Sequence, residues 1–246
     1  MMLAIIGGSG LSQLSSLAHT HRQVVRTPYG EPSGALTFGR IRGKEVVFLA
    51  RHGYGHTIAP HEVNYRANLW ALKEVQVEGV VSVASVGGIR KDLAPGTLLL
   101  PDQIIDYTWG RRSTYFEGAA SPVTHIDFTE PYSASLRRRI LEAARVCGEK
   151  VSERGTYAAS QGPRLETAAE INRLERDGAD VVGMTGMPEA ALARELGLEY
   201  AAIAVSANFA AGRGDSAHAV PLERIEAVLA ESMGRVRRII EQLVAA

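Results

Sequence analysis

The feature that most constrains the fold of this 246-residue chain is a repeated alternation between short apolar runs and helical patterns. The apolar runs end in glycine-rich or polar turns, and amphipathic stretches follow several of them. This alternation is typical of a mostly parallel sheet, because parallel strands need crossover connections that place helices on the faces of the sheet. We therefore expect one α/β domain over residues 1–246, with a mixed, mostly parallel central sheet flanked by helices.

Local patterns give the expected positions of these elements. Apolar runs rich in small and β-branched residues predict strands over residues 3–6, 45–50, 80–86, 97–100, 103–107, 155–159, 180–182 and 200–206. Apolar residues at three- and four-residue spacing predict helices over residues 64–73, 133–147, 167–177, 188–196 and 222–244. Two irregular stretches, 108–131 and 207–219, are longer than most connections in a compact domain, and we predict that they are functional loops.

Charge and composition exclude several classes of function. The chain carries 27 basic and 27 acidic side chains, which argues against a nucleic-acid partner, since a polyanion needs an excess of Lys and Arg. Its one cysteine, Cys147, forms no intramolecular disulfide, as is usual in a reducing cytoplasm. No apolar run reaches the ~20 residues of a membrane-spanning helix, and the N-terminus lacks the pattern of a signal peptide. We expect a cytoplasmic protein with no membrane partner.

Polar side chains follow or end five of the predicted strands. Because ligands of open α/β sheets bind beyond the carboxyl ends of the strands, we expect these side chains at one rim. A glycine-rich turn at residues 7–10 offers backbone amides, and an adjacent Arg and His suit a phosphate group. The side chains are Ser9, Arg51, His52, Ser85, Thr185 and Asn208. Each segment alone also fits a plain structural role, such as a tight turn, and Pro188 and Glu189 fit an ordinary helix start.

Three histidines close in sequence invite a metal-site interpretation, which we reject. His61 and Glu62 lack the second histidine of a zinc-binding helix, and no cysteine or carboxylate cluster near His52 and His56 completes a ligand set. No metal is therefore expected.

Taken in order, six segments resemble the purine nucleoside phosphorylase family, and more narrowly its 5′-methylthioadenosine phosphorylase branch. They are Ile-Ile-Gly-Gly-Ser-Gly-Leu at 5–11, Arg-His-Gly at 51–53, Val-Asn-Tyr-Arg-Ala-Asn at 63–68, Gly-Pro-Arg at 162–164, Gly-Ala-Asp-Val-Val-Gly-Met-Thr at 178–185 and Met-Pro-Glu at 187–189. The resemblance covers nearly the whole chain. It implies an enzyme, usually a homotrimer, that cleaves a purine N-glycosidic bond with inorganic phosphate as co-substrate and without a metal or organic cofactor.

The resemblance also implies roles for individual residues. It assigns phosphate binding to Ser9, Arg51, His52, Ser85 and Thr185. It places Met184 beneath the ribose, and it places Glu166, Asn208 and Ala210 around the purine. The sequence departs from the pattern at Leu165, where an aromatic that packs on the base is common, and at Ala84, where the branch often has a phosphate-binding threonine.

The expected catalysis requires no covalent enzyme intermediate. Arg51 and His52 would orient a phosphate oxygen toward the anomeric carbon, so that positioning and electrostatics supply most of the rate. Asn208 would stabilise the charge that develops on the leaving purine, and we count it with Arg51 and His52 as catalytic.

The identity of the base depends on the loop that carries Asn208 and Ala210. The methylthioadenosine branch typically has two aspartates there, which mainly accept hydrogen bonds and suit a 6-amino group. The Asn208 amide can donate to a 6-oxo group and accept from N7–H, and Glu166 can accept N1–H of hypoxanthine. A 6-oxopurine is therefore expected.

The residues expected near the 5′ position of the sugar suit a 5′-methylthio nucleoside better than inosine, which has a 5′-hydroxyl. Leu222 and Ile225 stand in the stretch where related inosine phosphorylases place a histidine, and they suit a methylthio group. Ordinary helix core is an equally good interpretation of both, and His218 is an alternative partner for a 5′-hydroxyl. Whether a neighbouring subunit completes the site stays open, with His56 and residues 108–131 as the candidates.

Together these features predict phosphorolysis of S-methyl-5′-thioinosine to hypoxanthine and 5-methylthioribose 1-phosphate. The alternatives within the class are a 5′-methylthioadenosine phosphorylase and a general 6-oxopurine nucleoside phosphorylase. A nucleosidase that uses water would share the leaving-group chemistry. From a different class, the chain would be a non-catalytic purine-binding module.

Overall fold

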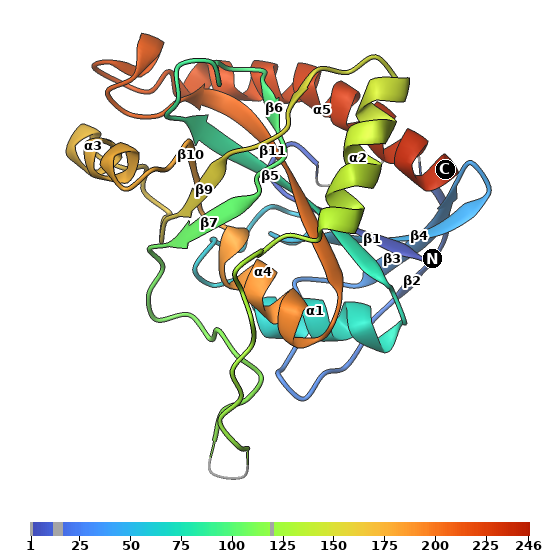
Figure 1. The fold of residues 1–246 in the computed structure, drawn as a ribbon. Coiled ribbons are helices and arrows are strands. Elements are labelled where there is room, and N and C mark those ends of the chain that lie inside the picture. Colours follow the sequence, from blue (N-terminus) through green and yellow to red (C-terminus); the bar gives the residue numbers. More distant parts are fainter. Residues whose placement is uncertain (1, 12–16, 119–120) are drawn as a thin grey trace.

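Figure 1 shows the computed structural model of the protein. It describes residues 2–11, 17–118 and 121–246. The centre of the sheet is β1 (Leu3–Gly7), which runs parallel to β4 (Lys44–Ala50) on one side and to β5 (Gly79–Gly88) on the other. All five residues of β1 are buried, as expected of an apolar strand that is covered on both faces.

The sheet widens on both sides of this centre. β11 (Glu199–Phe209) pairs in parallel with β5 along most of the length of both strands. Beyond β4, the strands β3 (Leu36–Ile41) and β2 (Ala18–Gln23) add antiparallel. Two short strands, β6 (Leu98–Leu99) and β8 (Val151–Ser152), extend the sheet beyond β11.

A second parallel group runs in the opposite direction. It consists of β10 (Val181–Gly183), β9 (Thr156–Ala159) and β7 (Gln103–Asp106). β10 pairs antiparallel with the end of β5, at Gly87 and Gly88. The chain that follows β10 is thereby carried back along β5, and the carboxyl ends of the two groups come together.

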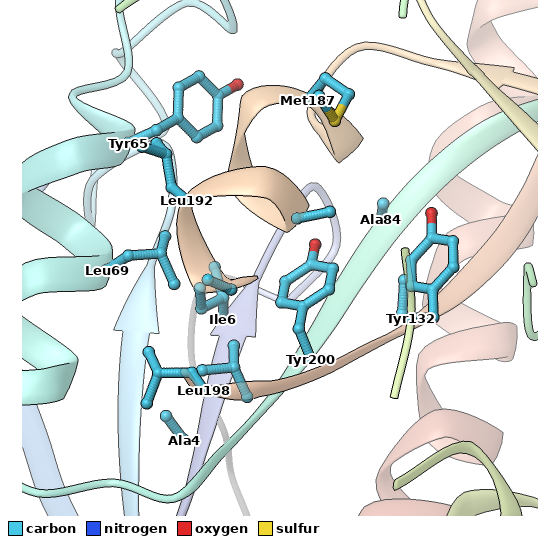
Figure 2. Close-up of a cluster of buried hydrophobic side chains, with 14 of the residues drawn as sticks. Ala4, Ile6, Tyr65, Leu69, Ala84, Tyr132, Met187, Leu192, Leu198 and Tyr200 are labelled. Carbon is cyan, nitrogen blue, oxygen red and sulfur yellow. The ribbon is translucent and has the colours of Figure 1, made fainter. Parts of the chain in front are cut away.

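The helices cover both faces of the sheet (Figure 1). On one face, α1 (Tyr65–Glu74) and α4 (Gly186–Glu195) pack with alternate residues of β1, and Figure 2 shows Leu69 of α1 and Leu192 of α4 in the same buried cluster as Ile6. On the other face, α2 (Ala134–Val146) and α5 (Leu222–Ala245) pack with the remaining residues of β1. This division follows from the two-residue period of a strand. Among the described residues, no helix is both long and apolar enough to cross a membrane.

Capping side chains explain where several helices begin. Asn64 accepts a hydrogen bond from the backbone of α1, and Ser133 does the same for α2. Thr167 and Glu170 form a reciprocal capping box at the start of α3 (Ala168–Arg176). Each of these residues satisfies a backbone N–H group that would otherwise lack a partner in the first turn.

The predicted fold class is confirmed, and every predicted strand and helix is present with small shifts at its ends. The sequence interpretation missed β2, β3 and β8. It was wrong about part of 207–219, because β11 continues to Phe209 and a short 3₁₀ helix, η1 (Gly214–Ser216), follows. It also ended β5 too early, since Gly87 and Gly88 remain paired with β10 and β11.

Candidate active site

A cavity of about 420 Å³ lies where β1, β4, β5, β10 and β11 end. The structure brings nearly all the predicted site residues together there. The lining includes Ser9, Arg51, His52, Ser85, Leu165, Glu166, Met184, Thr185, Asn208, Ala210 and Ile225. Leu222 does not line it: its side chain is 60% exposed and borders an adjacent hollow together with His218.

Arg51 is completely buried and held mainly by protein groups. Its Nε donates to Glu189 Oε2 at 2.7 Å, and Nη2 donates to Glu189 Oε1 at 2.9 Å and to Ser82 Oγ at 2.6 Å. Nη1 donates to the Val83 carbonyl at 3.0 Å. These bonds use four of the five N–H groups of a guanidinium, so one Nη1 hydrogen is left for a ligand.

Glu189 is the partner that makes this burial tolerable. Its side chain is also fully buried, and Oε1 additionally accepts from Ser82 Oγ and from the Tyr200 hydroxyl, each at 2.8 Å. A buried charge needs such a hydrogen-bonded counter-charge, because each ion loses its hydration on folding. The ion pair leaves the end of the cavity next to Arg51 with little net charge from this residue.

The close packing around Arg51 explains why residue 8 is glycine. A Cβ atom at Gly8 would lie 2.6 Å from the Val83 carbonyl and 2.9 Å from Arg51 Nη1. Neither neighbour can move easily, because one is backbone and the other is fixed by Glu189. The glycine therefore lets the turn after β1 approach the guanidinium.

His52 lies beside Arg51 and is held in one orientation. Its Nδ1 donates to the Ile58 carbonyl at 2.8 Å, which leaves Nε2 as the acceptor of a neutral ring. Burial, together with the nearby positive charge of Arg51, lowers the pKa of His52 to about 4. At neutral pH the imidazole is therefore uncharged and suited to accept a hydrogen bond from a protonated phosphate oxygen.

Hydroxyl groups complete this end of the cavity. Ser9 Oγ lies 3.4 Å from His56 Nε2, and Ser85 lines the cavity from β5. Thr185 is the N-cap residue of α4, but its hydroxyl makes no capping hydrogen bond to the backbone of that helix. The arrangement offers several neutral donors to a small oxyanion.

The opposite end carries the residues predicted to meet the base. Glu166 Oε1 accepts from Ser160 Oγ at 2.5 Å, which fixes the carboxylate and leaves Oε2 for a ligand N–H group. Asn208 Nδ2 donates to the Phe209 carbonyl at 2.7 Å. Within the part of the chain that the structure describes, Asn208 Oδ1 accepts no hydrogen bond. The amide therefore keeps one donor and its acceptor for a heterocycle.

A β-bulge in β11 sets the place of Asn208. Ser206 pairs with Val86 and Asn208 with Gly87, so that Ala207 is the extra residue of the strand. Bulges of this kind redirect side chains and are frequent beside binding sites. Ala210, which is buried, lines the cavity just beyond the bulge and presents only a methyl group.

Two residues with structural importance at this site were not recognised as such in the sequence. Glu189 was interpreted as an acidic residue of a helix start, whereas it is the buried partner of Arg51. Arg111, from the irregular stretch 108–131, contacts the backbone of two segments that border the cavity. Neither role has a local sequence signal, although the Met-Pro-Glu motif that contains Glu189 was noted. Among the described residues, no group of three or more His, Cys, Asp or Glu side chains is placed to hold a metal ion.

Comparisons with known proteins identify the family of this chain. The family described as "Phosphorylase superfamily" matches residues 2–245. A "Probable S-methyl-5'-thioinosine phosphorylase" of Pseudomonas syringae pv. tomato is 51% identical over 243 residues, which are 99% of this chain and 98% of that protein. The "6-oxopurine nucleoside phosphorylase" of Pyrococcus furiosus is 47% identical over 215 residues, 85% of this chain and 80% of that protein. Among solved structures, methylthioadenosine phosphorylase from Schistosoma mansoni in complex with adenine has a TM-score of 0.95 at 32% identity, and the match covers 100% of this chain and 91% of that one.

Proposed function

The chain belongs to the phosphorylase superfamily, and from this premise we propose that it cleaves S-methyl-5′-thioinosine with inorganic phosphate. The products are hypoxanthine and 5-methylthioribose 1-phosphate. Relatives that are 51% and 52% identical carry the name of this activity, and relatives at 47% and 48% are named for 6-oxopurine nucleosides. Both names fit a base with an oxygen at position 6.

The observation that carries the proposal is the Asn208 amide, which lines the cavity with an acceptor and one donor still available. A 6-oxopurine presents an acceptor at O6, and the leaving base presents a protonated nitrogen at N7. An amide satisfies both, whereas a carboxylate at this position would face O6 with a second acceptor. Ala210 adds no competing charge beside it.

The apolar groups near α5 support the methylthio end of the substrate. Val220 and Ile225 line the cavity and offer no hydrogen-bonding side-chain atoms. A 5′-methylthio group gains from leaving water in such surroundings, whereas a 5′-hydroxyl there would lose a hydrogen bond.

The reaction follows from the two ends of the cavity. A phosphate oxygen attacks the anomeric carbon, the bond between that carbon and N9 breaks, and its electron pair moves onto the purine, which takes up a proton from solvent at N7 and leaves as neutral hypoxanthine. Arg51 and the hydroxyls of Ser9, Ser85 and Thr185 would hold the phosphate, while neutral His52 accepts a hydrogen bond from its protonated oxygen. Asn208 meets the charge that develops on the base, and preorganised groups of this kind lower the barrier.

The remaining features of the proposal concern partners and compartment. Phosphate is the co-substrate, and the proposed reaction needs no metal or organic cofactor. We propose a homotrimer in the cytoplasm, a compartment that suits the free thiol of Cys147.

The test is a product assay on three nucleosides: S-methyl-5′-thioinosine, 5′-methylthioadenosine and inosine. We expect the highest kcat/KM for methylthioinosine and no turnover when phosphate is omitted. A clear preference for methylthioadenosine would overturn the base assignment, and a preference for inosine would overturn the 5′ assignment. Turnover without phosphate would indicate a nucleosidase, and saturable binding of hypoxanthine without any turnover would indicate a purine-binding module.

A further inference from the structure

We propose that Arg111 is a positioning residue that fixes the distance between the two ends of the proposed catalytic cavity. The proposal rests on the function given above, although Arg111 itself does not line the cavity. It belongs to the stretch 108–131, of which residues 108–118 follow β7 and run beside α4 (Figure 1).

The guanidinium group reaches two separate segments at once. Nη1 donates to the carbonyls of Met184 at 2.8 Å and Met187 at 2.6 Å. Nη2 donates to the carbonyl of Gln161 at 2.9 Å and approaches that of Ser160 at 3.3 Å. Nε donates to the side chain of Gln161 at 3.2 Å.

Each of these segments carries one end of the cavity. Met184 and Met187 flank Thr185, so the first pair of bonds holds the backbone on both sides of a proposed phosphate ligand. Ser160 holds Glu166 through its hydroxyl, so the second pair holds the support of a proposed base ligand. One side chain therefore connects the phosphate end to the base end.

Arginine is suited to this role in a way that lysine is not. A guanidinium presents five donors in a rigid planar fork, whereas an ammonium is a compact point charge with three donors. The ring of Tyr65, on α1, lies 5.5 Å from the guanidinium carbon and provides an additional cation–π contact. The fork is thus supported on one face while its edges bond the two segments.

The neighbouring residue is a matched control. Arg112 has the same side chain but is largely exposed, and it forms an ion pair with Glu117 at 3.4 Å. Arg112→Gln removes the same charge from the same loop without touching either segment. The comparison of Arg111→Gln with Arg112→Gln therefore separates positioning from a general effect of charge.

We expect Arg111→Gln to lower kcat/KM by roughly 10- to 100-fold, because small displacements of positioning groups are costly in catalysis. KM for phosphate and KM for the nucleoside should both rise, since both ends lose their support, and kcat per folded molecule should fall. Arg111→Lys should remain as impaired as Arg111→Gln, whereas millimolar guanidinium should restore part of the activity of Arg111→Ala. Arg112→Gln should match the wild type.

A measurement independent of turnover distinguishes this proposal from the function itself. Amide hydrogen exchange should be faster in peptides covering 159–166 and 183–189 of Arg111→Lys, and unchanged in Arg112→Lys. If the wild type cleaves no nucleoside, the proposed function fails while the exchange result still tests Arg111. The positioning role would be overturned if Arg111→Gln and Arg111→Lys kept the KM values and kcat of the wild type. It would also be overturned if hydrogen exchange were unchanged in both peptides. Should Arg111→Gln fail to fold, Arg111→Lys carries the same comparison.

Discussion

Arg51 and Glu189 form a two-point ion pair between side chains that are both completely shielded from solvent, with N–O distances of 2.7 and 2.9 Å. The two residues are 138 positions apart and come from the end of β4 and from α4. The pair joins the central sheet to the helix that follows the proposed phosphate ligand Thr185. Its integrity should therefore matter to stability as well as to catalysis.

Glu189→Gln should destabilise the protein by about 3–5 kcal/mol, because it leaves the buried Arg51 charge without a counter-charge. Urea unfolding measures the loss. The control is Glu142→Gln, which breaks a solvent-exposed pair with Arg145 and should leave the free energy of unfolding nearly unchanged. Equal losses in the two variants would contradict the importance of the buried pair.

Gly8→Ala should destabilise the protein by about 1–3 kcal/mol, since the added methyl group meets the Val83 carbonyl and Arg51. KM for phosphate should rise as well, because the turn that carries Ser9 must move. Thermal unfolding and initial rates check both effects. In α5, Gly234→Ala adds a methyl group that meets the Arg238 side chain at 3.8 Å, an ordinary contact distance, and should be neutral or stabilising by about 0.5–1 kcal/mol.

Asn208→Asp should shift selectivity from methylthioinosine toward methylthioadenosine. The new carboxylate faces O6 without a donor, and an unpaired buried polar group costs about 1–3 kcal/mol, so the ratio of the two kcat/KM values should change by ~10-fold or more. Asn172→Asp, an amide-to-acid change on an exposed part of α3, serves as the control. An unchanged ratio in Asn208→Asp would remove Asn208 from base recognition.

Ile225→Ser and Leu222→Ser should differ in their effect on the 5′ end. Ile225 lines the cavity, and a polar replacement should reduce the preference for methylthioinosine over inosine by ~10-fold. Leu222 is mostly exposed outside it, so its replacement should leave the preference unchanged. Steady-state rates of both variants on methylthioinosine and inosine measure the preference. A larger effect of Leu222→Ser than of Ile225→Ser would contradict the placement of Ile225 at the 5′ group.

His52 should make stability depend on pH below about 6.5. Its pKa is lowered to about 4 in the folded protein, so between these values the unfolded chain binds a proton that the folded protein does not. Stability should therefore fall as pH decreases from 6.5 to 4, by about 3 kcal/mol from this group. In His52→Gln that part of the slope should vanish, as measured by urea unfolding across this range. Parallel pH profiles for the two proteins would contradict a buried neutral imidazole.

Local sequence patterns were sufficient to predict most of the fold, because helix capping and the burial of apolar strands depend on residues that are close together in the chain. The predicted helices begin at Asn64, Ser133 and Thr167, which cap them in the structure, and the buried strands are apolar runs in the sequence. β2 and β3 were missed for the opposite reason. Their residues are mixed in polarity, and they form strands through tertiary pairing, since β3 pairs with the edge of β4 and β2 pairs with β3.

The candidate site was predictable to the extent that strand ends define it. Ser9 and Arg51 follow strands and Ser85 lies near the end of one, and the topology of the sheet then brings them to one cavity. The contacts of Glu189 and Arg111 join segments far apart in the chain, so no spacing rule reveals them. Leu222 and Ile225 were equivalent in sequence, and only the orientation of α5 separates them.

The bulge in β11 makes the proposed recognition of the base by Asn208 depend on chain length as well as on residue identity. If Ala207 were part of the regular pairing, it would take the place opposite Gly87 that Asn208 now holds, and a methyl group would stand where the amide stands. A single-residue insertion or deletion in this strand is therefore a route by which descendants of this enzyme can acquire a new preferred nucleobase while every other wall of the pocket stays the same.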